Sequence, residues 1–137
     1  MVLVLAGVLS AFVVPQLFNS DDFNARGFHD ETLAFLRYAH KSAIAQRRPV
    51  CVVFGVNTAT LKIDADRNPA TGSSGCEANL AGPRGTNLTA RGTVQYAVVP
   101  AAVVFNSLGQ PATAQTIQVA GAANPIVVEA GTGYVHE

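Results

Sequence analysis

The sequence has few charged residues. Lys, Arg, Asp and Glu make up 13% of the 137 residues, and the formal net charge is zero, whereas soluble domains average about 25% charged residues. Lysine is scarce among the basic residues, and no block of like charge occurs along the chain. Nucleic acid and anionic membrane surfaces attract clustered cations, so neither is indicated as a partner.

Several catalytic signatures are also missing. No serine lies in a nucleophile-elbow pattern, and the glycine- and serine-rich run 71–75 lacks the lysine of a phosphate-binding loop. The histidines, His29, His40 and His136, are scattered along the sequence. We expect His40 to be partly buried and hydrogen-bonded rather than a ligand. We therefore expect no enzyme activity and no cofactor.

Cysteine is limited to Cys51 and Cys76. In an exported domain such a pair suggests one disulfide, and in a cytosolic protein two buried thiols. A bridge would close a long loop and stabilise the fold by about 3–4 kcal/mol. The spacing does not match a metal site, and no other thiol or paired histidine accompanies it.

A weak candidate for a calcium site is formed by Asp64, Asp66 and Asn68, whose oxygens alternate as they do in calcium loops. Pro69 stands where the EF-hand pattern requires glycine, and no glutamate follows at the twelfth position. We therefore interpret this segment as a solvated turn and expect no bound metal.

The first eighteen residues contain no charged side chain. They are almost wholly apolar, with large side chains at Val2, Leu3, Val4, Leu5, Val8, Leu9, Phe12 and Val13. A helix over 1–14 would be about 21 Å long, which is short of the roughly 30 Å hydrocarbon core of a bilayer. The segment is therefore predicted to be a membrane helix that lacks its first turns, or a helix that leaves the membrane to pack against other helices.

This apolar segment has two alternative interpretations. A secretory signal peptide would need a basic start and a small-residue cleavage site, and the sequence shows neither. A buried core helix is the second alternative. Pro15 ends the apolar run, and it would remove one helical hydrogen bond and permit a bend.

The next segment, about 22–46, is predicted to be helical. Apolar residues recur every three or four positions, as Leu33, Leu36, Ala39, Ala43 and Ile44. Pro49 stops this helix.

After Pro49 the pattern becomes extended. A hairpin is expected from 50–54 and 60–63, followed by a long surface excursion over 64–92 with at most a short strand at 87–89. The later predicted strands are 94–99, 103–105, 116–119, 125–128 and 133–135. The sequence therefore predicts an α+β fold, in which a long N-terminal helix packs on a C-terminal antiparallel β-sheet or β-sandwich head.

This order of segments resembles a type IV pilin or pseudopilin. The run YAHKSAIAQRRPVCVVF (38–54) and the C-terminal VVFNSLGQPATAQTIQV (103–119) with its Gly-Tyr-Val end (133–135) are similar to the GspH/FimT-like group, most of all to MshC-type minor pilins of the MSHA pilus. The family also has a basic leader and a Phe-Thr-Leu-x-Glu motif, and here Met1 falls past both. We expect either a trimmed start or a chain that is not processed as a prepilin.

The resemblance implies a structural subunit. Its parts would be a membrane and fibre-core half-helix (1–18), an amphipathic half-helix (19–48) and a periplasmic head (49–137). The implied location is the bacterial inner membrane and then a fibre. The implied partners are other pilin or pseudopilin subunits, the inner-membrane assembly platform and, before assembly, membrane lipid.

Two alternatives exist within the class. One is the H-type minor pseudopilin of type II secretion, and the other is a FimT-like minor pilin that acts as a DNA receptor. A DNA receptor would need clustered cations. The basic residues near the head's loops are Arg84 and Arg91, and the last segment has no arginine, so nucleic acid is not the expected partner.

Overall fold

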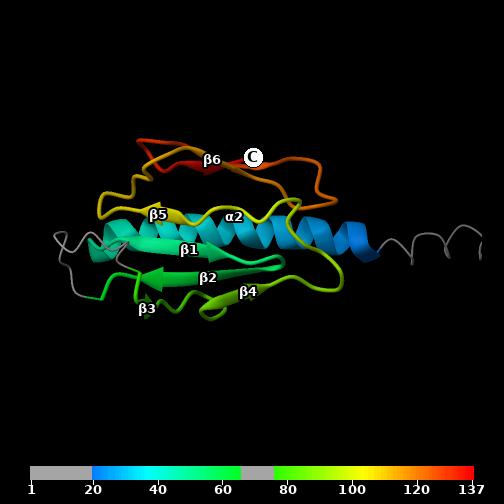
Figure 1. The fold of residues 1–137 in the computed structure, drawn as a ribbon, viewed down its shortest axis with the longest axis horizontal. Coiled ribbons are helices and arrows are strands. Elements are labelled where there is room, and N and C mark those ends of the chain that lie inside the picture. The colour runs from blue at the N-terminus through cyan, green and yellow to red at the C-terminus, as the bar shows by residue number, and fades with distance from the viewer. Residues whose placement is uncertain (1–19, 66–75) are drawn as a thin grey trace, which may run out of the picture.

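The computed structural model of the chain describes residues 20–65 and 76–137 (Figure 1). Across this part of the chain, helix α2 (Ser20–Gln46) packs on two antiparallel sheets. The larger sheet contains β1 (Val50–Phe54), β2 (Thr58–Ile63), β3 (Ala78–Asn79), β4 (Asn87–Thr89) and β5 (Val103–Phe105). The smaller sheet contains β6 (Gln115–Ile117), β7 (Ile126–Val128) and β8 (Val135–His136). The predicted α+β class is confirmed.

Helix α2 is 27 residues long, or about 40 Å at 1.5 Å per residue. Its buried side chains recur at helical spacing, as Ala25, Phe28, His29, Thr32, Phe35, Leu36, Ala39, Ser42 and Ala43. The predicted stripe was partly wrong, because Leu33 is only half-buried and Ile44 is 46% exposed. The buried face includes Thr32 and Ser42 instead, two small polar residues that a pattern of apolar residues does not select.

Helix α2 ends in a left-handed residue. Arg47 has φ 51°, and the amide of Arg48 donates to the carbonyl of Ala43 at 3.2 Å. The Arg47 amide donates to the carbonyl of Ile44 at 3.4 Å. Together these bonds form a Schellman end, in which glycine is the usual left-handed residue. Pro49 follows directly, so the predicted stop is confirmed.

Strands β1 and β2 are the inner strands of the larger sheet. The strand order is β3-β2-β1-β5, and β4 pairs with the far end of β2. Val52 stands opposite Leu61 of β2 and Val103 of β5, so apolar residues line up across three strands. The burial of β2 alternates strictly along its length, as expected for a strand with one face in the core.

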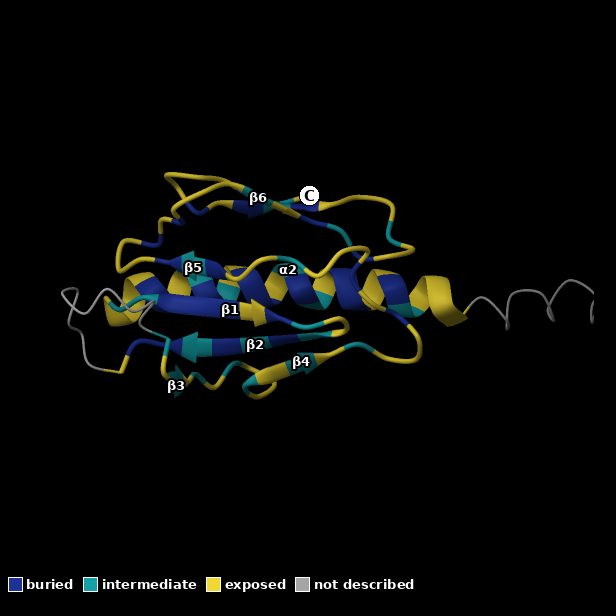
Figure 2. Cartoon of the chain, in the orientation of Figure 1, coloured by how far each residue is buried: buried dark blue, intermediate teal, exposed yellow. Residues whose placement is uncertain are grey.

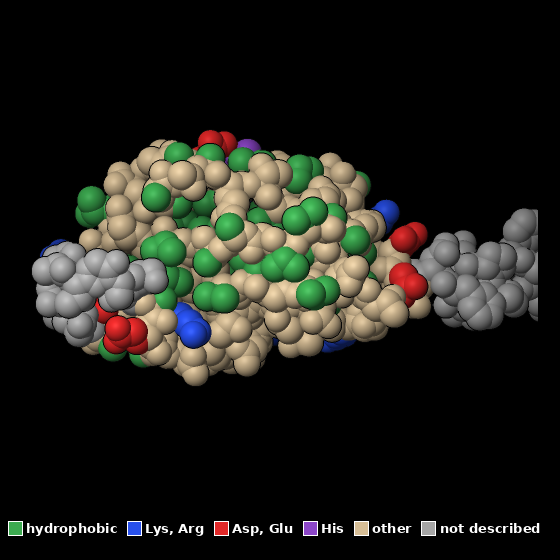
Figure 3. Space-filling model, in the orientation of Figure 1, with side chains coloured by type: hydrophobic (Ala, Val, Ile, Leu, Met, Phe, Trp, Pro, Cys, Tyr) green, Lys and Arg blue, Asp and Glu red, His purple; other side chains and the backbone are tan. Residues whose placement is uncertain are grey.

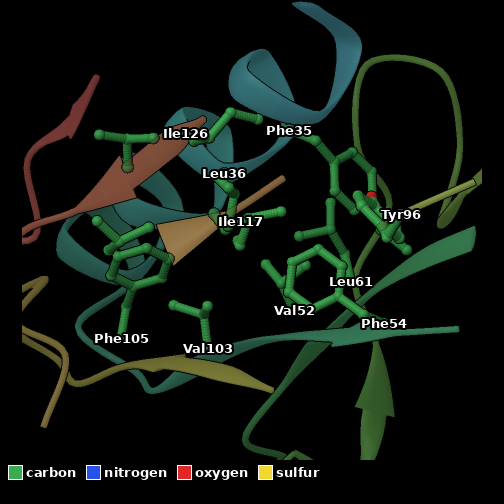
Figure 4. Packing of buried hydrophobic residues seen from close by; sticks show 14 of the residues in the cluster. Phe35, Leu36, Val52, Phe54, Leu61, Tyr96, Val103, Phe105, Ile117 and Ile126 are labelled. Carbon is green, nitrogen blue, oxygen red and sulfur yellow. The ribbon is translucent and has the colours of Figure 1, made fainter. Parts of the chain in front are cut away.

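The core lies between α2 and the inner faces of both sheets (Figure 2). α2 packs against β1, β4, β5 and β8. Fully buried side chains from every layer meet there, including Leu36, Leu61, Phe105, Ile117 and Ile126 (Figure 4). The helix is therefore held by both sheets along most of its length.

One predicted strand is wrong. The structure has no continuous strand over 94–99. Tyr96 makes a single bridge to Val119 there, and its amide donates to the carbonyl of Val56 at 3.0 Å. Pro100 follows and has no amide hydrogen to continue a ladder. Residues 97 and 98 form a bend instead, and Val98 is 78% exposed.

The other strand predictions lie within a few residues of the observed elements. The hairpin β1–β2, the short strand β4 and strand β5 are confirmed, with β2 beginning two residues earlier than expected. The last three strands are confirmed in number and order but are shorter or shifted by one or two residues. Short β3 was not predicted, and it pairs with the end of β2.

Candidate functional site

The exposed face of α2 is a continuous ridge along the molecule. Its members follow one another at three- and four-residue spacing, so they lie on one side of the helix. They are Phe23, Arg26, Asp30, Ala34, Arg37 and Lys41, here called the α2 ridge. Phe23 is 77% exposed, which is unusual for a large aromatic side chain. The ridge therefore presents apolar and charged groups of both signs to the outside.

A groove runs along one flank of the ridge. Its volume is about 280 Å³, and it lies between α2 and the segment that leads into β4. The floor is largely apolar, with Ala34 and Phe35 from the helix and Pro83 and Leu88 from the other side. Such a hollow can receive an apolar side chain from a partner surface.

A salt bridge crosses that groove. Nη1 of Arg84 lies 2.6 Å from Oε1 of Glu31. The Arg84 side chain is 76% exposed, so solvent screens the pair and its contribution to stability is below about 1 kcal/mol. Arg84 is thus engaged with the helix and is not part of a cluster of free cations.

A second hollow lies on the other flank of the ridge. Its volume is about 220 Å³, and Arg26, His29 and Asp30 of α2 line one side of it. Residues 122–124 and Glu137 line the other side. Asp30 borders both hollows, so the α2 ridge lies between them.

A buried hydrogen-bond chain fixes the helix to the head beneath the ridge. The Thr32 hydroxyl donates to the carbonyl of Phe28 at 2.7 Å, and it lies 3.1 Å from the Tyr96 hydroxyl. Thr32 has one hydroxyl proton, so Tyr96 must be the donor of the second bond. Phe28 and Phe54 pack on the Tyr96 ring at centroid distances of 4.9 and 5.3 Å.

Burial raises the pKa of Tyr96 to about 12, and the Thr32 hydrogen bond opposes this shift. Tyr96 therefore stays neutral at physiological pH and keeps its donor proton. Two further bonds tie the helix to its neighbours on either flank. The Tyr38 hydroxyl donates to the carbonyl of Ala81 at 2.9 Å, and Nε of Arg37 donates to the carbonyl of Val135 at 3.1 Å. The orientation of the ridge on the head is thus set at several points.

The two cysteines form a disulfide in the structure. Cys51 of β1 and Cys76 have Cα atoms 6.0 Å apart and are separated by 25 positions in the chain. The bridge links the centre of the larger sheet to the chain just before β3. On the chain-entropy estimate, closing a loop of that length stabilises the fold by about 3.5 kcal/mol.

The weak calcium candidate is represented in the structure by Asp64 alone, since Asp66 and Asn68 lie outside the described residues. Asp64 is buried, and its amide donates to the carbonyl of Pro49 at 3.0 Å. Within 20–65 and 76–137, no group of three His, Cys, Asp or Glu side chains could hold a metal ion.

The apolar segment lies outside the described residues, as does Pro15 with its predicted bend. The predicted membrane and fibre-core side chains there are Val2, Leu3, Val4, Leu5, Val8, Leu9, Phe12 and Val13. Among the helices that the structure does describe, none is long and apolar enough to cross a membrane.

Sequence patterns did not reveal the ridge with its two hollows. The charged residues of α2 can be read from the sequence, but the hollows also need residues 83–84, 87–88, 122–124 and 137, which approach α2 only in the folded chain. His40 is half-buried and lies 3.2 Å from the carbonyl of Thr132, as predicted for a hydrogen-bonded residue.

Comparisons with solved structures place this fold among known ones. The minor pilin FimU of the Pseudomonas aeruginosa type IV pilus matches with a TM-score of 0.58 and 16% identity, over 85% of this chain and 90% of that one. The minor pseudopilin EpsH of the Vibrio cholerae type 2 secretion system matches with a TM-score of 0.58 and 13% identity, over 82% of this chain and 94% of that one. At such identities the likeness shows a shared fold.

Sequence comparisons complete the assignment. A search of curated proteins gave no match. The sequence profile of the GspH family, described as type II transport protein GspH, matches residues 30–133. That range covers the C-terminal two-thirds of α2 and nearly all of the head, well over half of the chain, and the chain therefore belongs to the GspH family.

Proposed function

We propose that this chain is a minor pilin-like structural subunit of a type IV filament of the MSHA type. It acts in assembly of the filament or at its tip, as a priming subunit, by helix-to-helix packing and contacts of the head. The resemblance of 38–54 and 103–119 to MshC-type minor pilins supports the choice of filament. The proposed role is structural and not catalytic, and it requires no cofactor.

The proposed parts have different tasks. Residues 1–18 anchor the chain in the inner membrane and later pack in the fibre core. Residues 19–48 extend that helix beneath the head, and residues 49–137 form the head in the periplasm. A uniformly apolar helix with all backbone groups paired suits lipid and a helix bundle equally well. The proposed partners are membrane lipid, the inner-membrane assembly platform and other pilin or pseudopilin subunits.

The observation that carries the proposal is the α2 ridge. One face of a 27-residue helix is fixed in the core, and the opposite face stays open between two hollows. This open face leaves the side chains that border both hollows available to a neighbouring subunit. Neighbouring subunits that stack along a fibre axis can engage it repeatedly.

A second candidate is an H-type minor pseudopilin of type II secretion. The description of the matching family, type II transport protein GspH, favours it. Both roles use the same α2 ridge, and the phenotype of a gene deletion distinguishes them. A DNA-receptor role has less support, because Arg84 is engaged by Glu31 and phosphate binding needs several clustered cations.

The test combines gene deletion with site-specific crosslinking in the native host. Deletion should abolish surface filaments if the chain is a minor pilin, or export of secreted proteins if it is a pseudopilin. A photo-crosslinking amino acid at Ala34, on the ridge, should form adducts with another pilin-class subunit. The same group at Thr113, an exposed position on the β5–β6 connection, is the matched control. Normal filaments and secretion after deletion, without adducts at Ala34, would refute the proposal.

A further inference from the structure

The histidines, dispersed in the sequence, converge in the fold. His29, His40 and His136 are all the histidines of the chain, and each contacts the segment 129–137. That segment holds β8 and the turn before it, and with β7 it is here called the C-terminal hairpin. Tertiary structure thus brings every imidazole of the chain to a single element.

His136 joins the two arms of the hairpin. Its Nε2 lies 2.8 Å from Oε1 of Glu129, which directly follows β7. The ring also stacks on Tyr134 at a centroid distance of 5.1 Å. The hydrogen bond to Glu129 raises the pKa of His136 above its ordinary value of 6.5, while Arg37 acts in the opposite direction. Protonation therefore strengthens closure of the hairpin.

His29 joins the hairpin to α2. The residue is 4% exposed, and its Nδ1 lies 3.2 Å from Oδ1 of Asp30. Its Nε2 is buried and lies 3.7 Å from Oε2 of Glu137, and it has no hydrogen-bond partner among the described residues. A neutral imidazole has one N–H and can serve one of the two carboxylates, whereas an imidazolium can serve both.

His40 provides the contrast. Its Nε2 lies 3.2 Å from the carbonyl of Thr132, and its ring packs edge-on against Phe105. A carbonyl needs one donated proton, which the neutral ring already supplies. His40 therefore holds the same hairpin by a contact that does not require a charged ring.

We propose that the C-terminal hairpin is a pH-sensitive latch, which the protonated ring of His136 closes against Glu129 while the buried ring of His29 faces Glu137 from α2. On loss of the His136 proton, β8 detaches more readily from α2. The hairpin would then open locally while the larger sheet and its disulfide stay intact. Such a local opening would reshape the hollow that His29 and Glu137 border.

Charged groups from several elements face the latch. The carboxylates of Asp30 and Glu137 face His29, and Arg26 lines the same hollow. Arg37, whose Nε donates to the carbonyl of Val135, opposes the charged form of His136. The turn 122–124 contributes no charge.

The sign of the pH effect follows from the raised pKa of His136. Its contribution is fully present below the unfolded value of about 6.5 and is lost as the pH rises through the higher folded value. The latch is therefore tightest in mildly acidic conditions.

Hydrogen–deuterium exchange of the full chain in a mild detergent tests this latch. Protection factors of amides 126–137 are corrected for intrinsic exchange rates and divided by those of the β1 and β2 amides. This relative protection should be roughly threefold or more higher at pH 5.5 than at pH 7.5. The double variant His29→Gln with His136→Gln should abolish that ratio. The control His40→Gln should lower protection at both pH values and leave the ratio unchanged.

A second pair of variants guards against loss of folding. Glu129→Gln with Glu137→Gln changes two side chains that are about half exposed, and it removes the acceptors without disturbing the buried ring of His29. This variant should also show no pH-dependent ratio. Equal protection at the two pH values in the unmodified chain, or a ratio that persists in both double variants, would overturn the proposal.

Discussion

Helix α2 and the segment 92–128 differ in how they use charge. α2 carries acidic and basic residues along its exposed face, whereas no charged residue stands between Arg91 and Glu129. The face of the molecule shown in Figure 3 accordingly has apolar side chains along its middle and few charges, most of them near its edges. The regular period of helix α2 is enough to place its side chains. The position of the segment 92–128 instead depends on backbone hydrogen bonds, turns and contacts with α2.

The glycines show most directly that the C-terminal segment depends on its turns. Gly92, Gly109, Gly121, Gly131 and Gly133 all have positive φ, and all lie in or just after the uncharged segment. The described residues of α2 contain Gly27, and a Cβ there would meet nothing within 4 Å. The helix therefore has room for a Cβ at its glycine, whereas the glycines of the C-terminal segment have a backbone conformation that disfavours any side chain.

The largest effect is expected for Gly133→Ala. A Cβ at this position would overlap the carbonyl oxygen of Gly109 and press on the ring of His40. The residue also has φ +71°, which disfavours any side chain. We expect a loss of roughly 3–5 kcal/mol in the free energy of unfolding, measured with urea in a mild detergent.

The matched control is Gly131→Ala in the same turn. It has φ +81°, but a Cβ there would meet nothing within 4 Å. Only the backbone cost of about 1 kcal/mol should remain. Equal losses for the two variants would show that the close approach of the two turns does not exist.

The disulfide should give the next largest effect. Replacing Cys51 and Cys76 together by serine should lower the free energy of unfolding by about 3 kcal/mol, because the unfolded chain regains the entropy of the open loop. Mass spectrometry of periplasmic material without reductant should detect the bridged peptides in the unmodified chain. Two alkylatable thiols in that material would contradict the bridge.

Tyr96→Phe tests the hydrogen-bond chain under the α2 ridge. The ring remains between Phe28 and Phe54, and the Thr32 hydroxyl keeps its bond to the Phe28 carbonyl. We expect a loss of about 1 kcal/mol by urea unfolding, the value of one hydrogen bond. Tyr38→Phe is the exposed control and should lose less stability. A larger loss for Tyr38→Phe would show that the Tyr38 hydrogen bond holds α2 more strongly than the Tyr96 hydrogen bond does.

Sequence patterns predicted the fold where local signals suffice. The helix up to Gln46, the stop at Pro49 and the hairpin of β1 and β2 each follow from periodicity or from one residue's chemistry. The pattern failed at 94–99, where a β-branched run has strand character but Tyr96 forms just one bridge. Pairing over long sequence distances decided that region, and local propensity carries no information about it.

The candidate site was less predictable than the fold for the same reason. The charges of the ridge can be recognised from the sequence, but Pro83, Leu88 and Ala122 approach the helix only after folding. The convergence of His29 and His136 on one hairpin has no signature in the sequence, since they are 107 positions apart. Thr32 was missed because a polar residue is not expected in a core until its partner, Tyr96, is known.

The smallest predicted effect concerns the junction between helix α2 and strand β1. Arg47 holds the left-handed position at the end of α2, where glycine is free of steric cost. Arg47→Gly should therefore raise the free energy of unfolding by about 0.5–1 kcal/mol, in contrast to the losses expected at Gly133. Arg47→Ala is the control, because alanine meets the same steric cost as arginine and should leave stability nearly unchanged. If Gly and Ala behaved alike, the helix would not end in the left-handed turn described here, and its junction with β1 would have a different geometry.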